Sequence, residues 1–292
     1  MRESAARSLN IAAPDRAALP VNYTAYADAA ELREFVPFVH ELIGCAFGVI
    51  RPLFLSGTAV DTKSDASPVT RADRGAEEAM RALIEGRYPG HGILGEEFGV
   101  KHGTRYRWVL DPVDGTRAFI TNCFLFGTLI ALERDDGAGF RPLLGALAHP
   151  AAGVALIGHR GECRLYRTDG TERVARVRAC ARLEDATVLA TTHWSTGEQA
   201  GGPAVEALIR RAKLYRTWGD CFGYFALATG GADVMLDPSL AYWDVAAIIP
   251  VVEGAGGTVT GWSGGDPLAR PSLIATAGPL HEEVLAVLRG AG

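Results

Sequence analysis

The residues best suited to chemistry in this sequence are Asp111 and Asp114, two aspartates three positions apart that follow a short apolar run. The run Trp108–Leu110 predicts a buried strand. Pro112 has no N–H to donate to a sheet, so we expect the strand to end there. Gly115 then allows a tight turn and a close approach to a ligand. Acids at a strand end, beside the start of a helix, can hold a cation and a phosphate together.

Two further acids occur in similar settings. Glu96 follows the apolar pair Ile93–Leu94, and Asp244 opens a predicted apolar helix. A simpler explanation stays open at this stage, because aspartates are common in turns and as helix caps. Asp111 and Asp114 could cap the helix that follows them, and Asp244 could be an N-cap.

As a group, these acids predict a metal site built from oxygen ligands. Without His or Cys partners at zinc-ligand spacing, such a set selects Mg²⁺ or Mn²⁺. Asp111 would bridge two ions, with Asp114 and Asp244 on one ion and Glu96 on the other. The carbonyl of Val113, which we expect to be free beyond the strand, would add another oxygen. Two such ions can clamp a phosphate ester, activate a water and steady the leaving oxygen.

Neighbouring residues could move the proton and bind the phosphate. Thr116 follows the turn, with its hydroxyl near the expected water, and Asp73 could accept the proton. The N–H groups of Gly115 and Thr116 would bind phosphate oxygens. Thr70 and Asp73 also have capping-box spacing, so a structural role stays open for both.

Composition is ordinary for a soluble globular protein of 292 residues, with 48% hydrophobic and 22% charged residues. A net charge of −5 without a Lys/Arg run argues against a nucleic-acid polymer or an anionic membrane surface as partner. The five cysteines are odd in number and form no C-x-x-C, which favours reduced thiols. We expect no membrane-spanning window and no signal peptide, and therefore a cytoplasmic protein.

The first half of the chain predicts two helices followed by an antiparallel meander. A helix over about residues 27–55 has Asp28 as its N-cap, and a second helix begins near Asp73. The expected strands of the meander are residues 126–134, 143–149, 154–159 and 162–166.

The second half mixes strands and helices. We expect strands over residues 187–191, 213–217, 232–237 and 273–276, and helices over residues 204–212, 219–229, from 243 onward, and 281–288. Residues 1–22 are expected to be a loose tail, and residues 23–292 one composite fold. Its α+β lobe covers about residues 23–180, and its α/β lobe about residues 181–292.

The acid motifs closely resemble those of the inositol monophosphatase family of magnesium-dependent, lithium-sensitive phosphatases. The resemblance extends from about Lys63 to Thr260, and its matching segments are Gly95–Glu97, Asp111–Thr116 and Trp243–Ala247. It implies an αβαβα sandwich, two or three Mg²⁺ ions with Mn²⁺ possible, inhibition by Li⁺ and a homodimer. It also implies that Glu96 acts with Thr116 on the attacking water, and that Lys63 and Asp65 belong to a mobile loop.

Three segments are most similar to bacterial histidinol-phosphate phosphatases: Thr116–Thr121, Phe126–Leu132 and Arg216–Tyr224. This similarity implies L-histidinol phosphate as substrate, a step of histidine biosynthesis. A substrate with an amine and an imidazole favours pocket acids, for which Asp220 and Asp237 are the candidates, together with Thr192. Asp220 discriminates better, because inositol-type substrates also place an acid at Asp237. Asp220 could instead be an N-cap.

Other functions stay open. Inositol 1-phosphate, or another sugar, nucleotide or biosynthetic phosphate, could be the substrate, since the metal motifs are shared across the family. A non-catalytic binding homologue is a second alternative. A phosphatase with an aspartyl-phosphate intermediate is a third, but its acids are spaced two apart, whereas Asp111 and Asp114 are three apart.

Overall fold

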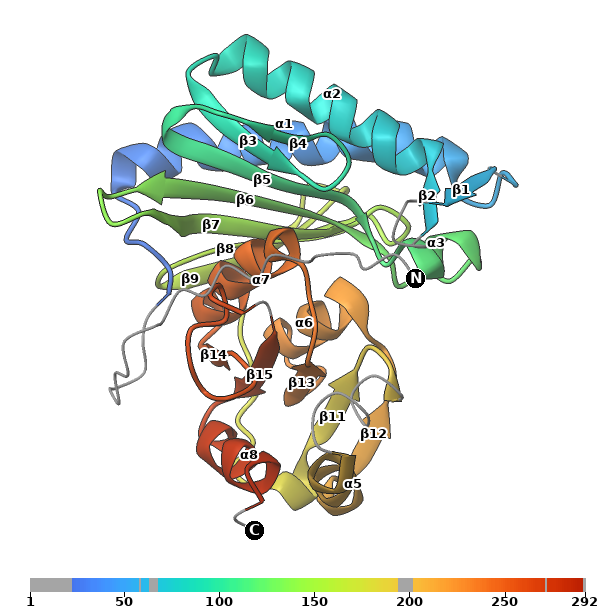
Figure 1. The fold of residues 1–292 in the computed structure, drawn as a ribbon, viewed down its shortest axis with the longest axis vertical. Coiled ribbons are helices and arrows are strands. Elements are labelled where there is room, and N and C mark those ends of the chain that lie inside the picture. Colours follow the sequence, from blue (N-terminus) through green and yellow to red (C-terminus); the bar gives the residue numbers. More distant parts are fainter. Residues whose placement is uncertain (1–22, 58, 63–67, 194–201, 271, 291–292) are drawn as a thin grey trace, which may run out of the picture.

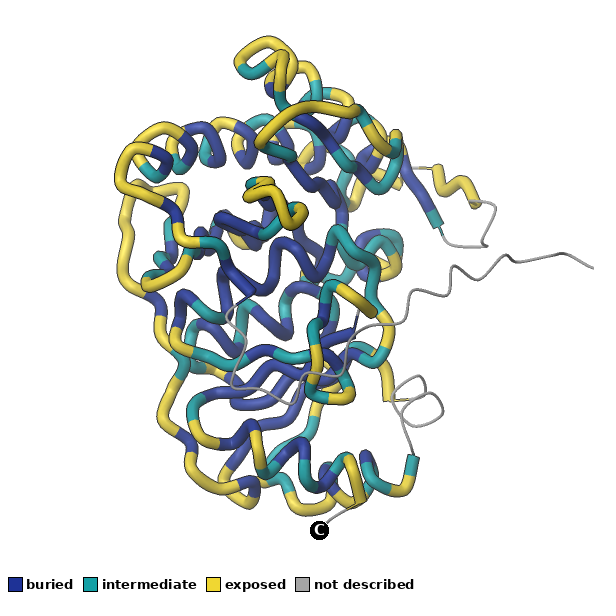
Figure 2. Tube along the Cα trace, turned by 60° about the vertical axis from the view of Figure 1, so that its left-hand side comes forward, coloured by how far each residue is buried: buried dark blue, intermediate teal, exposed yellow. Residues whose placement is uncertain are grey.

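The computed structural model describes residues 23–57, 59–62, 68–193, 202–270 and 272–290. These residues form five layers: two helices, an eight-stranded sheet, two more helices, a five-stranded sheet and a final pair of helices (Figure 1). The predicted αβαβα sandwich is therefore confirmed. Figure 2 shows buried residues running through the inner layers, with exposed residues mainly on the outer helices and loops.

The outer helices α1 (Ala29–Leu53) and α2 (Arg71–Arg87) cover one face of the large sheet. The predicted N-cap Asp28 is confirmed, since its carboxylate accepts the N–H groups of Ala30 and Glu31, both at 2.8 Å. By length and composition, α1 could cross a membrane, so the expectation that no window would do so is wrong. One face of α1, including Phe35 and Leu42, is instead buried in the protein core.

The large sheet has the order β10-β9-β8-β7-β6-β5-β3-β4. Only β3 and β5 pair in parallel, and the predicted meander is confirmed as β6 to β9. The strands are β3 (His91–Gly95), β4 (Gly99–Lys101), β5 (Thr104–Asp114), β6 (Gly127–Asp135), β7 (Phe140–His149), β8 (Val154–His159), β9 (Glu162–Arg167) and β10 (Glu172–Ala175). A separate small hairpin is formed by β1 (Val60–Thr62) and β2 (Pro68–Thr70).

The prediction that the central strand ends at Pro112 is wrong, because β5 continues through the proline to Asp114. The pairing with β6 shifts register between Asp111 and Asp114, so the proline lies in a bulge where its missing N–H costs no ladder bond. The carbonyl of Pro112 is used instead, since Thr128 Oγ1 donates to it at 2.8 Å. The bulge redirects the end of the strand, and both aspartates lie on it.

The smaller sheet has the order β12-β11-β13-β15-β14, with β12, β11 and β13 parallel and the other pairings antiparallel. Its strands are β11 (Thr187–Ala190), β12 (Leu214–Arg216), β13 (Val234–Asp237), β14 (Gly257–Thr260) and β15 (Leu273–Ala277). The remaining helices are η1 (Leu183–Asp185), α5 (Gly202–Arg211), α6 (Asp220–Ala228), α7 (Tyr242–Gly254) and α8 (Leu280–Leu288).

Helix α7 lies between the two sheets and is apolar on nearly all sides, as its position requires. It approaches the large sheet closely at two glycines. A Cβ on Gly145 would overlap the carbonyl of Ala247, and one on Gly158 would overlap the backbone at Val251. This packing brings the start of α7 beside the end of β5.

Candidate active site between the two sheets

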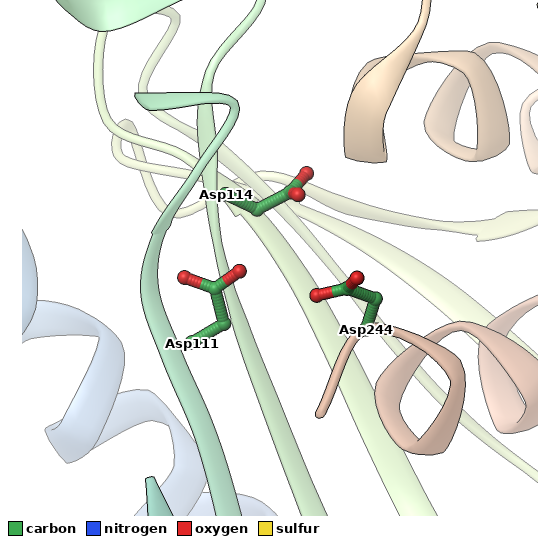
Figure 3. A group of neighbouring side chains, drawn as sticks. All are labelled: Asp111, Asp114 and Asp244. Atoms are coloured by element: carbon green, nitrogen blue, oxygen red, sulfur yellow. The ribbon is translucent and has the colours of Figure 1, made fainter. Parts of the chain in front are cut away.

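Three aspartates from two elements bring their carboxylates together (Figure 3). Asp111 and Asp114 lie at the end of β5, and Asp244 lies in the first turn of α7. One carboxylate oxygen from each lies within 4.8 Å of those of the other two. Asp111 is only 3% exposed and Asp244 only 8% exposed, so the cluster is largely shielded from bulk water.

Burial and mutual repulsion make these carboxylates costly to ionise. Burial, followed by the charge of Glu96, raises the pKa of Asp111 well above its usual range. Burial and the charge of Asp220 have the same effect on the pKa of Asp114, and burial raises the pKa of Asp244 to about 7. Among the described residues, no Lys or Arg forms an ion pair with the three aspartates. Such a set of buried oxygen donors fits a divalent cation, whose charge would offset the repulsion.

Glu96 adds a fourth carboxylate from the neighbouring strand. It follows β3, and its N–H donates to the carbonyl of Leu110 at 3.1 Å. Its side chain hydrogen-bonds to Asp111. The four acids singled out in the sequence therefore lie together, where β3, β5 and α7 meet.

Asp244 is not the N-cap considered for it in the sequence, although its side chain does bond to the start of the helix. The N-cap residue of α7 is Ala241, and its N–H donates to the Asp244 carboxylate at 2.8 Å. The same carboxylate hydrogen-bonds to Asp111. Its bond to the helix end fixes the side chain and still leaves oxygen lone pairs for a cation.

The hydroxyl of Thr116 lies between two acceptors, 3.2 Å from Asp73 Oδ1 and 3.0 Å from the carbonyl oxygen of Val113. The other carboxylate oxygen of Asp73 accepts the N–H and the hydroxyl of Thr70, at 2.8 and 2.6 Å. Burial raises the pKa of Asp73. The capping box at Thr70 and the contact with Thr116 therefore coexist. The expectation that the Val113 carbonyl is free is wrong, because Thr116 can donate to it.

The turn after β5 is made by Gly115, which has a φ of 75°. It is the N-cap of α3 (Thr116–Ile120), and it provides no side-chain cap. The alternative in which Asp111 and Asp114 only cap this helix is therefore wrong. The absence of a side chain at Gly115 also leaves room for Asp220, whose Oδ2 would lie 2.9 Å from an added Cβ.

The start of α6 brings the second half of the chain to the cluster. The N–H of Cys221 donates to Asp114 Oδ2 at 2.6 Å, and its thiol also hydrogen-bonds to this carboxylate. Sequence analysis did not assign a role to Cys221, because a single cysteine in an apolar helix has no recognisable metal or redox spacing. Its signals were its position next to Asp220 and within the segment Arg216–Tyr224.

Asp220 is the first residue of α6, and the N-cap is Gly219. The alternative in which Asp220 is the N-cap is therefore wrong. Its backbone has a φ of 49°, which is rare for a residue other than glycine and typical of functional sites. Its N–H donates to Thr191 Oγ1 at 3.0 Å, and burial raises the pKa of its carboxyl group.

Asp237 is the last residue of β13 and is buried. It accepts the hydroxyl of Tyr224 at 2.8 Å and also hydrogen-bonds to Thr191. Burial raises the pKa of Asp237 to about 7. Thr191, which sequence analysis passed over, therefore contacts both acids, while its neighbour Thr192 is exposed. Lys63 and Asp65 lie outside the described residues.

The chain is similar to known proteins of one family. The inositol monophosphatase family model matches residues 31–291. A histidinol-phosphatase of Chlorobaculum parvum is 38% identical over 200 residues, covering 68% of this chain and 74% of the relative. A histidinol-phosphatase of Streptomyces coelicolor is 33% identical over 231 residues, covering 78% and 86% respectively. A solved structure of an inositol monophosphatase from Zymomonas mobilis shares 34% identity with a TM-score of 0.77, covering 90% of this chain and all of that one. The chain therefore belongs to the inositol monophosphatase family and is a phosphatase.

Proposed function

We propose that this protein is a Mg²⁺-dependent phosphomonoesterase that hydrolyses a small-molecule phosphate ester by direct attack of water, without a phosphoenzyme. The observation that carries the proposal is the buried cluster of Asp111, Asp114 and Asp244, which has no cationic partner among the described residues. These aspartates, with Glu96 and the carbonyl of Val113, would hold two or three Mg²⁺ ions. Mn²⁺ should substitute, and Li⁺ should inhibit. When bound, the ions supply charge neutralisation and a more acidic water.

The chain's own residues provide a route for the proton of that water. Thr116 can donate its hydroxyl proton to Asp73 while it accepts one from the water. Asp73 is suited to receive it, because Thr70 fixes one of its oxygens and leaves the other directed at Thr116. Glu96, beside Asp111, would orient the water from the opposite side.

Phosphate binding is proposed for the turn that opens α3. The N–H groups of Gly115 and Thr116 lie at the start of a helix that has no side-chain cap. Such N–H groups suit phosphate oxygens. The carboxylate of Asp220 lies next to Gly115, so a substrate whose phosphate binds here would place its organic part near that acid.

The substrate we propose is L-histidinol phosphate, with Asp220, Asp237 and Thr192 as its contacts. Two relatives named histidinol-phosphatase support this choice, as does the carboxylate of Asp220 at the site. A cationic amine would favour the ionised form of these two acids, whose pKa is otherwise raised by burial. Since Tyr224 and Thr191 already bind Asp237, we assign the main ionic contact to Asp220.

Inositol 1-phosphate is the second candidate substrate. It is supported by the 34% identity to the inositol monophosphatase from Zymomonas mobilis. Inositol carries no positive charge, so it would gain little from an ionised Asp220 beyond the acid shared at Asp237.

Phosphate release with Mg²⁺ tests the substrate. The panel contains L-histidinol phosphate, inositol 1-phosphate, fructose 1,6-bisphosphate and 3′-phosphoadenosine 5′-phosphate. We expect histidinol phosphate to be preferred, and Asp220→Asn to reduce kcat/KM for it by about tenfold to a hundredfold, the usual effect of losing a charged hydrogen bond. A strong preference for another ester would contradict the substrate while keeping the reaction. No release from any ester would contradict the proposed activity and favour a binding homologue.

The remaining properties are proposals that rest on the family. We propose a cytoplasmic homodimer that requires neither a nucleic-acid polymer nor a membrane, with Lys63 and Asp65 on a loop that moves at the site. Light scattering after size-exclusion chromatography tests the dimer. A mass equal to one chain at micromolar concentration would contradict it.

A further inference from the structure

Glu77 is a buried carboxylate that neither the metal cluster nor the proton route uses. It lies on α2 and is fully buried. Its Oε2 accepts the N–H of Glu97 at 2.7 Å, and its Oε1 accepts the N–H of Phe98 at 3.1 Å. Both donors belong to the turn between β3 and β4, which immediately follows Glu96.

Arg81 contacts the same turn one helical turn later. Its Nε donates to Glu77 Oε1 at 2.7 Å, and its Nη2 donates to the carbonyl of Gly99. The turn is shaped to receive the carboxylate, because a Cβ on Gly95 would overlap Glu77 Oε1. Glu77 and Arg81 therefore hold the turn at several backbone atoms, from Glu97 to Gly99.

Glu96 lies between the backbone atoms bound by Glu77 and Arg81 and the central strand β5. On one side its own N–H donates to the carbonyl of Leu110, and on the other side the next two N–H groups bind Glu77. Its side chain then meets Asp111. Helix α2 also carries Asp73, four residues before Glu77 and so about 6 Å along the same helix face. One rigid helix thus sets the positions of both Glu96 and Thr116.

We propose that Glu77, supported by Arg81, is a positioning residue that orients Glu96 and so sets the affinity of the site for divalent cations. This inference rests on the proposed function in so far as Glu96 is a metal ligand. Carboxylates that bind metals are themselves commonly fixed by outer hydrogen bonds, and losing such a bond typically costs 10–100-fold in metal affinity. In this protein, Glu77 accepts hydrogen bonds from backbone N–H groups next to the proposed metal ligand Glu96.

The test is Mn²⁺ binding to the full-length protein by isothermal titration calorimetry, together with the Mg²⁺ dependence of phosphate release. Glu77→Gln keeps the shape of the side chain but brings an NH₂ group to backbone N–H donors. We expect it to weaken binding of at least one Mn²⁺ ion by about tenfold. The Mg²⁺ concentration for half-maximal activity should rise similarly, while kcat at saturating Mg²⁺ stays within about threefold.

Glu31→Gln is the matched control. Glu31 is also a buried glutamate that accepts a backbone N–H, from Asp28 at 2.9 Å, and pairs with an arginine, Arg134 at 2.7 Å. It also accepts the hydroxyl of Tyr106, five residues before Asp111 on β5 and so about 17 Å away along the strand. The Glu31→Gln variant should be less stable to denaturation but keep its Mn²⁺ affinity within about twofold. That range lies below the tenfold loss expected when a hydrogen bond that supports a metal ligand is removed.

Unchanged Mn²⁺ affinity in folded Glu77→Gln would overturn the inference, and so would an equal loss of Mn²⁺ affinity in Glu31→Gln. If Glu77→Gln does not fold, unchanged Mn²⁺ affinity in Arg81→Met would overturn it. Weaker Mn²⁺ binding in Glu77→Gln, when even the wild-type protein releases no phosphate, would support the positioning role and contradict the proposed function alone.

Discussion

Thr116 has one hydroxyl proton and two acceptors within reach, Asp73 and the carbonyl of Val113. When the hydroxyl donates to Asp73, its lone pairs can face a water. When it donates instead to the carbonyl of Val113, the threonine serves only to stabilise the bulge. A proton route from water to Asp73 requires the first arrangement, and substitutions of Thr116 distinguish the two arrangements.

Thr116→Val removes the hydroxyl but keeps the branched shape. We expect kcat to fall by about 10²–10⁴, the usual contribution of a positioned proton acceptor. Thr116→Ser keeps the hydroxyl and should keep kcat within about tenfold of wild type, well above the loss expected for valine. Steady-state kinetics at saturating Mg²⁺ measures both. Equal activities in the two variants would assign Thr116 a structural role.

Site residues could be predicted from the sequence where the residue type itself indicates the chemistry, as a carboxylate does for metal binding. Glu96, Asp111 and Asp114 could be chosen because each follows an apolar strand, and Asp244 because it opens an apolar helix. Thr191, Cys221 and Tyr224 could not, because their contacts depend on which elements lie side by side. Thr191 contacts Asp220 and Asp237 only because β11, β13 and α6 meet at one edge.

At the scale of the elements, the close approach of α7 to the large sheet decides where Asp244 lies. Gly158 on β8 faces the backbone of α7 at Val251 with no room for a side chain. An added methyl group would force the helix and sheet apart.

We expect Gly158→Ala to lower the free energy of unfolding by about 1–3 kcal/mol, because overpacking here meets backbone rather than a flexible side chain. The control is Gly48→Ala on α1, where an added Cβ meets nothing within 4 Å. That change should raise stability by about 0.5–1 kcal/mol through helix propensity. Urea denaturation measures both, and a neutral Gly158→Ala would show that α7 can shift freely.

The bulge at Pro112 marks the limit of prediction at this scale. A proline lacks the N–H of a central strand, which argued for an end to the strand. The structure keeps the strand by shifting register, with Thr128 bonding to the Pro112 carbonyl. The register shift and the hydrogen bond from Thr128 both involve β6, and the residues next to Pro112 in the sequence do not indicate them. Regular helices such as α1 and α2 were predicted closely because their caps and apolar faces are local signals.

At the scale of the whole molecule, buried histidine and buried acids make the stability of the fold depend on pH in opposite directions. His281 is buried, with Thr276 Oγ1 2.9 Å from its Nδ1 and Thr260 Oγ1 3.1 Å from its Nε2. Burial lowers the pKa of His281 from 6.5 to about 4. Its neutral form therefore stabilises the fold above pH 6.5, and that contribution is lost as the pH falls toward 4. The acids of the site, whose pKa values are raised by burial, have the reverse effect without metal.

The difference in unfolding free energy between the wild-type protein and His281→Gln isolates the contribution of the histidine, because the acids contribute equally to both proteins. His281→Gln should cost less stability at pH 5 than at pH 7, by roughly 2 kcal/mol, from about 1.4 kcal/mol for each pH unit below 6.5. Denaturation of both proteins in chelator at the two pH values measures the difference. An equal cost at both would mean that His281 titrates normally in the folded protein.

The five-layer fold is the feature that joins the two halves of the chain into one site. The end of β5 provides Asp111 and Asp114, and the turn after β3 provides Glu96. The second half of the chain provides Asp220 and Asp244. Apolar patterning predicted the individual helices and strands, whereas the layer order was implied by the resemblance to the family. The close contacts that unite the layers depend on packing across them.

The most direct test of the central claim is phosphate release from L-histidinol phosphate and inositol 1-phosphate, with and without Mg²⁺, by the wild-type protein and Asp114→Asn. Asp114 lies in the cluster and is fixed by the N–H of Cys221. We expect wild-type activity to require Mg²⁺, and the variant to remain folded but lose at least about a hundredfold in kcat, as for loss of a main electrostatic element of catalysis. Full Mg²⁺-dependent activity in Asp114→Asn, or wild-type activity in chelator, would contradict a phosphatase mechanism centred on these carboxylates.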